Sequence, residues 1–251
     1  MPEAISGLIE GRHAVKQALE SGRPIYRLYL LTGGEGLSAF KYLARERGVP
    51  VHECDRPRMD ALSREANGGA LGSHQGVMAV AAAHAYAEPD DIFNRANGAP
   101  PFIVVCDGVE DPRNLGALIR TAEAAGAHGL VTRERRGAGL TATCAKAAAG
   151  ALEHLPVARV PGIPSFLETC KKRGLWIYGA EPGQNARPAS ETDFSGGTVL
   201  VLGGESQGLS KLTRQRCDFL VSVPMYGKTP SLNVSAAAAI IMFEIAKQLH
   251  R

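Results

Sequence analysis

Apolar positions in the first part of the chain recur with the spacings of short strands and amphipathic helices. A short strand or turn followed by a helix is expected over 6–20, and Val15 and Leu19 share one face of that helix. The other expected elements are strands at 25–31, 49–52 and 76–81 and helices at 37–47 and 60–66. Strands that alternate with helices in this way predict a small α/β unit.

A second, larger unit begins at the unbroken apolar run Phe102–Cys106, which is typical of a strand covered on both faces. A helix stripe follows it, with Asn114 as the expected N-cap and Gly126 just past the end. The further expected elements are strands at 129–132, 156–160, 175–180, 198–203 and 219–223 and helices at 141–151, 163–173 and 209–215. The pattern predicts an α/β fold with a mostly parallel sheet and helices on both faces.

The end of the chain combines a short strand, a turn and a helix. Pro224, Gly227 and Pro230 restrict the turn after the strand at 219–223. Four alanines and several isoleucines then make the last helix apolar on most sides, which predicts that this helix is buried.

Residues 82–100 differ from both neighbours, because they are mostly small and acidic and include Pro89 and Pro100. This composition predicts a linker, with one helical turn at Asp91–Arg95. We therefore divide the chain into a first unit at 1–82, a linker at 83–99 and a second unit at 100–251.

Composition and charge restrict the function only weakly. The hydrophobic content of 45% is normal for a protein with a full core, and the net charge is +3. Residues 100–251 hold seventeen Lys and Arg against thirteen Asp and Glu, a net of +4. This mild basic excess suits an anionic ligand without demanding one.

The five cysteines are scattered and contain no Cys-x-x-Cys pair, so we expect reduced thiols, with no zinc site and no disulfides. The seven histidines lack metal-ligand spacing. No apolar run is long enough to span a bilayer. We expect a soluble cytoplasmic protein without a metal.

Three polar loops follow strands of the larger unit, and in a parallel sheet they share the carboxyl edge, where ligands bind. They are Asp107–Asn114, which leads to Arg120, then Gly203–Ser210 and Met225–Ser235. The glycines of the second loop match neither the P-loop nor the dinucleotide pattern, which argues against an NTP or dinucleotide site.

The residues alone leave the roles of these loops open. Gly203–Ser210 could be a plain tight turn. Arg120 could pair with Glu123 on the surface or hold a phosphate. Glu205 could be an exposed acid or a buried anchor, and Ser231 and Asn233 could be simple helix caps.

At these loops the chain resembles the TrmH (SpoU) family of RNA ribose 2′-O-methyltransferases, within the SPOUT superfamily. The resemblance is carried by Asn114-Leu-Gly-Ala-Leu-Ile-Arg120, by Leu202-Gly-Gly-Glu205-Ser-Gln-Gly-Leu and by Val223-Pro-Met-Tyr-Gly-Lys-Thr-Pro-Ser-Leu-Asn-Val-Ser235. In the first unit, Gly7-x-x-x-Gly-x-His-Ala-Val and His74-Gln-Gly76 are similar to the L30-like substrate-binding domain that many members carry.

This resemblance implies a C-terminal trefoil knot, bound S-adenosylmethionine and a homodimer that completes the site. By motif position, Gly203, Val223 and Leu232 would contact the methyl donor. The catalytic neighbourhood would comprise Asn114, Arg120, Glu205, Ser231 and Asn233.

Within the family the chain is most similar to the RlmB type, which implies methylation of a guanosine ribose in 23S rRNA. A tRNA substrate and an antibiotic-resistance rRNA methyltransferase are the alternatives in the same class. A non-catalytic RNA-binding protein is the alternative of another class. The basic residues Arg133, Arg135, Arg136 and Lys146 could touch RNA phosphates or form a solvated loop.

Overall fold

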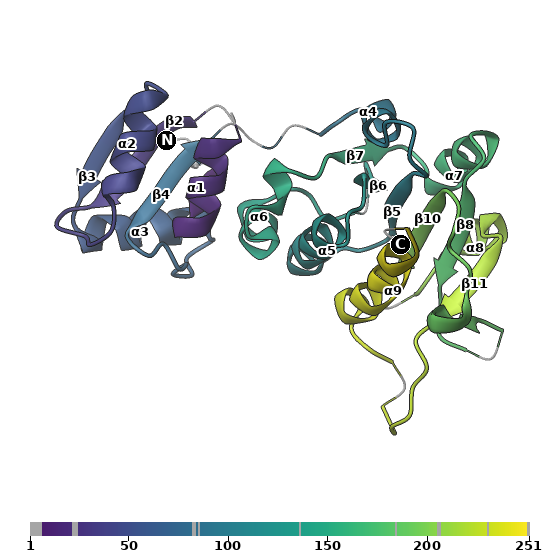
Figure 1. Ribbon diagram of the computed structural model, residues 1–251. Helices are drawn as coiled ribbons and strands as arrows, with labels where there is room; N and C mark the ends of the chain where they lie inside the picture. Colours follow the sequence, from purple (N-terminus) through teal and green to yellow (C-terminus); the bar gives the residue numbers. More distant parts are fainter. Residues whose placement is uncertain are drawn as a thin grey trace. The chain divides into compact units, whose positions relative to one another are not determined.

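The computed structural model describes residues 7–21, 25–81, 84, 86–135, 137–183, 185–204, 207–229 and 231–249. The chain forms two compact units (Figure 1). The first comprises 1–85 together with 140–154, and the second comprises 86–139 together with 155–251. The sequence placed 140–154 in the second unit, because adjacency along the chain does not reveal which core a segment joins.

The sheet of the first unit has the order β1-β4-β2-β3, formed by Leu8–Glu10, Val77–Ala81, Ile25–Leu31 and Val51–Cys54. β4 runs antiparallel to β1 and β2, and β3 runs parallel to β2. The helices α1 (Arg12–Glu20) and α2 (Ser38–Glu46) share one apolar cluster with this sheet, and α3 (Arg56–Ala66) contributes to a second cluster. The predicted small α/β unit is therefore built as a two-sided sheet.

The second unit has a seven-stranded sheet in the order β7-β6-β5-β10-β8-β11-β9. Its strands are Val157–Val160, Gly129–Arg133, Phe102–Asp107, Thr198–Gly203, Trp176–Ala180, Phe219–Ser222 and Arg187–Pro188. Every neighbouring pair is parallel. The predicted parallel α/β fold is confirmed, and the trefoil knot stays a prediction.

Helices cover both faces of this sheet (Figure 1). On one face α4 (Pro89–Arg95) packs on β6 and β7, while α7 (Ile163–Lys172) packs on β8 and on α8 (Lys211–Arg216). On the other, α5 (Pro112–Ala124) and α9 (Val234–Leu249) lie side by side against β6 and β10. The remaining helices are α6 (Ala142–Ala148) and the 3-10 turns η1 (Ala151–Glu153) and η2 (Ala189–Glu191).

The segment expected to be a linker with one helical turn at Asp91–Arg95 contains α4, which is part of the core of the second unit. Glu88 and Asp91 form a capping box at its start, and Pro89 occupies a first-turn position. Ile92 is fully buried against the sheet. A Cβ on Gly129 would lie only 2.6 Å from Ile92 Cγ1, so the strand makes room for this side chain by carrying a glycine.

The start of α5 differs from the prediction by one turn. Asp111 is the N-cap, because its Oδ1 accepts a hydrogen bond of 2.8 Å from Arg113 N–H. Asn114 therefore lies inside the first turn of the helix. The sequence contains two capping residues here, and Pro112 favours the earlier one because proline is well tolerated in the first turn.

The last helix is only partly buried within one chain. Ile241 and Ile245 lie in the core, as predicted. Ile240 is 45% exposed and Phe243 is 52% exposed, so the prediction of a helix buried on most sides is wrong for this face of α9. Among the described residues, no helix has the length and apolar content needed to cross a membrane.

We predict that Ile92→Ala lowers the free energy of unfolding of the second unit by about 2–5 kcal/mol, because it opens a cavity in a packed core. The fluorescence of Trp176, the only tryptophan of the chain, reports this unit during urea unfolding. Asn94→Ala, on the exposed side of the same helix, should change that free energy by less than about 0.5 kcal/mol. Equally small changes in the free energy of unfolding for Ile92→Ala and Asn94→Ala would show that α4 is not part of the core.

Candidate active site

Three loops meet at the carboxyl edge of the large sheet because the strands that precede them run parallel. β5 and β10 are direct neighbours, and Gly203 pairs with Asp107 at their ends. β11 pairs with β8, which in turn pairs with β10. The structure thus brings the three polar loops to one edge, as the sequence predicted.

A cleft of about 510 Å³ opens at this edge. Its walls come from the ends of β8, β10 and β11, from the turn before α9 and from α9 itself. The lining includes Gly203, Val223, Ser231, Leu232 and Asn233. The cleft therefore gathers all three residues expected to contact a methyl donor and two of those expected around the reaction.

The glycine loop after β10 leaves no room for side chains at its base. A Cβ on Gly203 would lie 2.2 Å from the carbonyl carbon of Gly208, and a Cβ on Gly204 would lie 2.4 Å from Gly108 O. Gly204 and Gly208 also exchange backbone hydrogen bonds of 2.9 and 3.1 Å. The loop is a tight turn, whose exposed backbone a ligand can approach closely. Glu205 lies outside the described residues.

The starts of α5 and α9 are joined by two asparagines. Asn233 Nδ2 donates a hydrogen bond of 3.2 Å to Asn114 Oδ1. Asn233 Oδ1 in turn accepts bonds from the backbone N–H and the hydroxyl of Ser235, so Asn233 caps α9. Two helix N-termini consequently meet beside the cleft, where their partial positive charges favour an anion.

Arg120 lies apart from this cleft. It is exposed on α5 and does not line the cavity. Within the described part of the chain its side chain has no hydrogen-bond or ion-pair partner, so the alternative of a surface pair with Glu123 is not realised. The structure brings Asn114 to the start of α9 but leaves Arg120 facing solvent.

A buried carboxylate that the sequence did not single out ties the strand ends together. Asp107 is almost completely buried at the end of β5. Its Oδ1 pairs with Arg133 at the end of β6, and its Oδ2 accepts a hydrogen bond of 3.0 Å from Ser210 N–H. The signal in the sequence was an acid placed directly after an all-apolar strand, because a buried carboxylate needs partners.

The four basic residues considered for RNA contact differ in their surroundings. Arg133 is engaged with Asp107, and Arg135 is exposed. Lys146 belongs to the first unit, and Arg136 lies outside the described residues.

The described residues offer no metal centre at the cleft. No group of three or more His, Cys, Asp or Glu side chains with the geometry to hold a metal ion occurs in the described part of the chain. All five cysteines are free thiols. Burial raises the pKa of Cys144, Cys170 and Cys217 to about 12, so these three side chains stay protonated at neutral pH.

Comparison with known proteins identifies the family. The family model described as "SpoU rRNA Methylase family" matches residues 101–243, which covers the three loops. The chain belongs to the SpoU rRNA methylase family. A second family model, "RNA 2'-O ribose methyltransferase substrate binding", matches residues 8–87 of this SpoU-family chain.

Relatives of this SpoU-family chain extend over both units. It is 39% identical to YacO of Bacillus subtilis over 95% of this chain and 94% of the relative, whose name assigns it to the TrmH family of tRNA/rRNA methyltransferases. An AdoMet-bound rRNA methyltransferase from Sinorhizobium meliloti superposes with a TM-score of 0.78 at 25% identity, over 98% of this chain and 89% of that one.

The TrmH/SpoU tRNA modifying enzyme of A. aeolicus is 30% identical with a TM-score of 0.55. The match covers 60% of this SpoU-family chain and 76% of that enzyme. The chain is thus an RNA methyltransferase of the SpoU/TrmH family, and its similarity to the rRNA enzyme spans far more of its length.

We predict that Arg133→Ala lowers the free energy of unfolding by about 3 kcal/mol, because it leaves the buried charge of Asp107 without its partner. Arg135→Ala removes the same charge two residues later, where it is exposed, and should cost less than about 0.5 kcal/mol. Urea unfolding followed by Trp176 fluorescence measures both variants. Similar values for the two variants would contradict a structural role for the Asp107–Arg133 pair.

Proposed function

We propose that this chain transfers the methyl group of S-adenosylmethionine to a ribose 2′-hydroxyl of RNA, and that its target is a guanosine of 23S rRNA. The observation that carries the proposal is the cleft at the carboxyl edge, where the glycine loop and the Ser231–Asn233 turn meet. These are the segments by which the chain resembles the family, and the AdoMet-bound relative from Sinorhizobium meliloti supports the same donor.

The residues of the cleft fit the proposed methyl donor. Gly203, Gly204 and Gly208 line the cleft with backbone alone, so a ligand can approach the loop closely. Val223 and Leu232 supply apolar contacts. S-adenosylmethionine supplies an activated methyl group, so the protein mainly has to align the donor with the hydroxyl. Alignment of this kind can lower a barrier by up to about 7–11 kcal/mol.

We assign the chain's polar residues to positioning the RNA. Asn114 and Asn233 hold two helix N-termini beside the cleft, which suits the phosphate next to the reacting ribose. Arg120 is proposed to clamp a phosphate in bidentate geometry, rather than to act as a base, because a guanidinium stays protonated. Ser231 and Glu205 complete the proposed neighbourhood, and the base remains unassigned.

A homodimer is part of the proposal. Arg120 does not reach the cleft of its own chain, and Ile240 and Phe243 leave apolar surface exposed on α9. Pairing with a second copy would cover this surface and could bring the arginine of one chain to the cleft of the other. The same pairing would explain why α9 is apolar on most sides.

The extent of the similarity favours rRNA over tRNA as the substrate. The rRNA enzyme from Sinorhizobium meliloti matches 98% of the chain, whereas the match to the tRNA enzyme of A. aeolicus covers only 60%. The first unit is the part that fits a substrate-binding family, so it is expected to select the RNA.

A map of ribose 2′-O-methylation in cells with and without this gene tests the target. Alkaline fragmentation sequencing reads the marks on rRNA and tRNA together, because a 2′-O-methyl group blocks cleavage at its own nucleotide. We expect deletion to remove one guanosine mark from 23S rRNA and the wild-type gene to restore it. Loss of a tRNA mark alone would show that the target is tRNA and not rRNA. If no mark were lost, the result would support the alternative of a non-catalytic RNA-binding protein.

We predict that Arg120→Lys lowers the turnover of RNA methylation by about tenfold or more, because lysine keeps the charge but loses the two-pronged hydrogen bonding. Binding of S-adenosylmethionine, measured by calorimetry, should not change. Arg216→Lys is the matched control, since Arg216 pairs with Glu168 on the surface and lysine can keep that pair. Near-full turnover of Arg120→Lys would contradict the phosphate clamp.

A further inference from the structure

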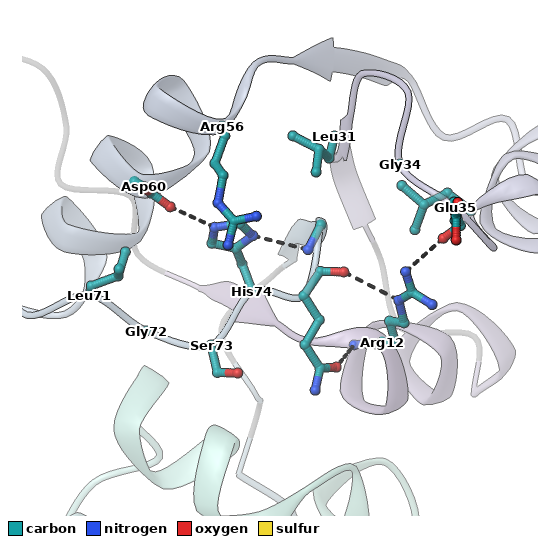
Figure 2. Close-up of a pocket in the computed structure, with 13 residues that line it drawn as sticks. Arg12, Leu31, Gly34, Glu35, Arg56, Asp60, Leu71, Gly72, Ser73 and His74 are labelled. Carbon is teal, nitrogen blue, oxygen red and sulfur yellow. Dashed lines mark hydrogen bonds and ion pairs between the residues drawn. The ribbon is translucent and has the colours of Figure 1, made fainter.

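The first unit contains a second cavity, formed entirely by its own residues (Figure 2). It measures about 470 Å³ and lies where the end of β2, the start of α1, the start of α3 and the loop before β4 converge. This volume falls in the range of small-molecule sites, about 300–1,000 Å³. The cleft of the second unit does not include any of these residues.

The two motifs noted in the first unit meet at this cavity. Arg12 N–H donates to Gln75 Oε1 at 3.0 Å, and Arg12 Nε donates to Gln75 O at 3.2 Å. Arg12 Nη2 also donates to Glu35 O at 2.7 Å. These hydrogen bonds hold the guanidinium of Arg12 in place, where it connects the loop before β4 to the loop after β2 and forms one side of the cavity (Figure 2).

The loop before β4 is held in an unusual backbone conformation. Gln75 has a φ of 51°, one of three non-glycine residues with positive φ in the described part of the chain, and Gly76 follows with 80°. Such conformations persist only where the surroundings enforce them, and they concentrate at ligand sites.

The buried ring of His74 supplies that enforcement. His74 is 5% exposed; its Nδ1 accepts from Gly76 N–H at 3.0 Å, and its Nε2 lies 2.8 Å from Asp60 Oδ1. The hydrogen bond with His74 lowers the pKa of the Asp60 carboxyl. Because both ring nitrogens are engaged, His74 is a positioning residue and is not available as a catalytic base.

The remaining walls present apolar surface and the exposed side chain of Arg56. Leu31 and Leu37 form part of the lining, and Leu71 stands at the rim with half of its surface exposed. Arg56 extends from the first turn of α3 toward the middle of the cavity (Figure 2). Its side chain has no hydrogen bond or ion pair to another described residue, although its charge, after the larger effect of the His74 hydrogen bond, helps to lower the pKa of Asp60.

Apolar walls beside a guanidinium match the chemistry of one unstacked nucleotide. A base excludes water against leucine side chains and stacks on guanidinium planes, while its phosphate takes paired hydrogen bonds from arginine. A fully apolar ligand would leave Arg56 unused, and a bare anion would leave the leucines unused. Two acids line the cavity: Asp60 is bonded to His74, and Glu35 accepts a hydrogen bond from Arg12 through its backbone oxygen.

We propose that this cavity binds one unstacked nucleotide of the RNA substrate, with the base against Leu31, Leu37 and Leu71 and the phosphate on Arg56. This assignment rests on the proposed function only because it takes RNA as the source of the nucleotide. The lining of this cavity shares no residue with that of the methyl-donor cleft.

Fluorescence anisotropy of the full chain with a short single-stranded RNA of random sequence, over a series of salt concentrations, tests the site. Arg56→Gln should weaken binding about tenfold. It should also reduce the slope of log affinity against log salt by about 0.7, the value for one phosphate of a single strand. Leu71→Ala should weaken binding about fivefold without changing that slope, because it removes apolar contact and no charge.

Arg45→Gln is the matched control. Arg45 is exposed on α2 of the same unit and does not line the cavity. This variant should leave the affinity and the salt slope unchanged. Equal losses of RNA affinity in Arg45→Gln and Arg56→Gln would overturn the proposal, because they would indicate a diffuse attraction of RNA to the charge of the unit. Unchanged RNA affinity in both Arg56→Gln and Leu71→Ala would also overturn it.

Competition separates RNA from a free nucleotide as the occupant. A mixture of the four ribonucleoside 5′-monophosphates should displace the RNA only at concentrations far above those of the RNA itself. Displacement of the RNA by the monophosphates at equal concentrations would contradict RNA as the occupant of the cavity. None of these binding measurements needs methyl transfer. A protein without methyltransferase activity would therefore refute the proposed function, while the binding measurements would still decide whether the nucleotide site exists.

Discussion

The carboxylate of Asp107 is the constraint on which the larger unit's site depends. A charge buried at the end of β5 has to be neutralised and hydrogen-bonded, and the partners come from two other segments. Arg133 arrives from the end of β6, and Ser210 N–H arrives from the loop after β10. The loop that carries Gly203 is thereby fixed to the neighbouring strands, and it forms one wall of the cleft.

The cavity of the first unit is built on the same physical basis. A buried polar ring, His74, accepts a hydrogen bond from Gly76 N–H and donates one to Asp60, and it holds Gln75 and Gly76 in conformations that a free loop would rarely adopt. In each unit a buried polar side chain shapes a loop at the edge of a sheet. The two sites share no lining residue, and under the proposed function both would contact one RNA molecule.

Much of this architecture could be predicted from the sequence. The apolar run Phe102–Cys106 and the later strands are visible as periodic patterns, and they place three polar loops at one sheet edge because parallel strands end there. Only one turn of the helix at Pro89–Arg95 was expected, because its short, acidic sequence resembles a linker, although burial of Ile92 makes it part of the core. Asn114 was a plausible cap, but Asp111 fills that position.

By itself the sequence determined the two α/β units, the polar loops and the family, because periodicity and motifs are properties of neighbouring residues. Only the tertiary structure decided which distant groups meet. Asn114 bonds to Asn233 across 119 positions, and Arg12 bonds to Gln75 across 63. It also decided that Arg120 faces solvent while Arg133 is paired. Such partnerships depend on how strands are ordered in a sheet, and no local pattern records that order.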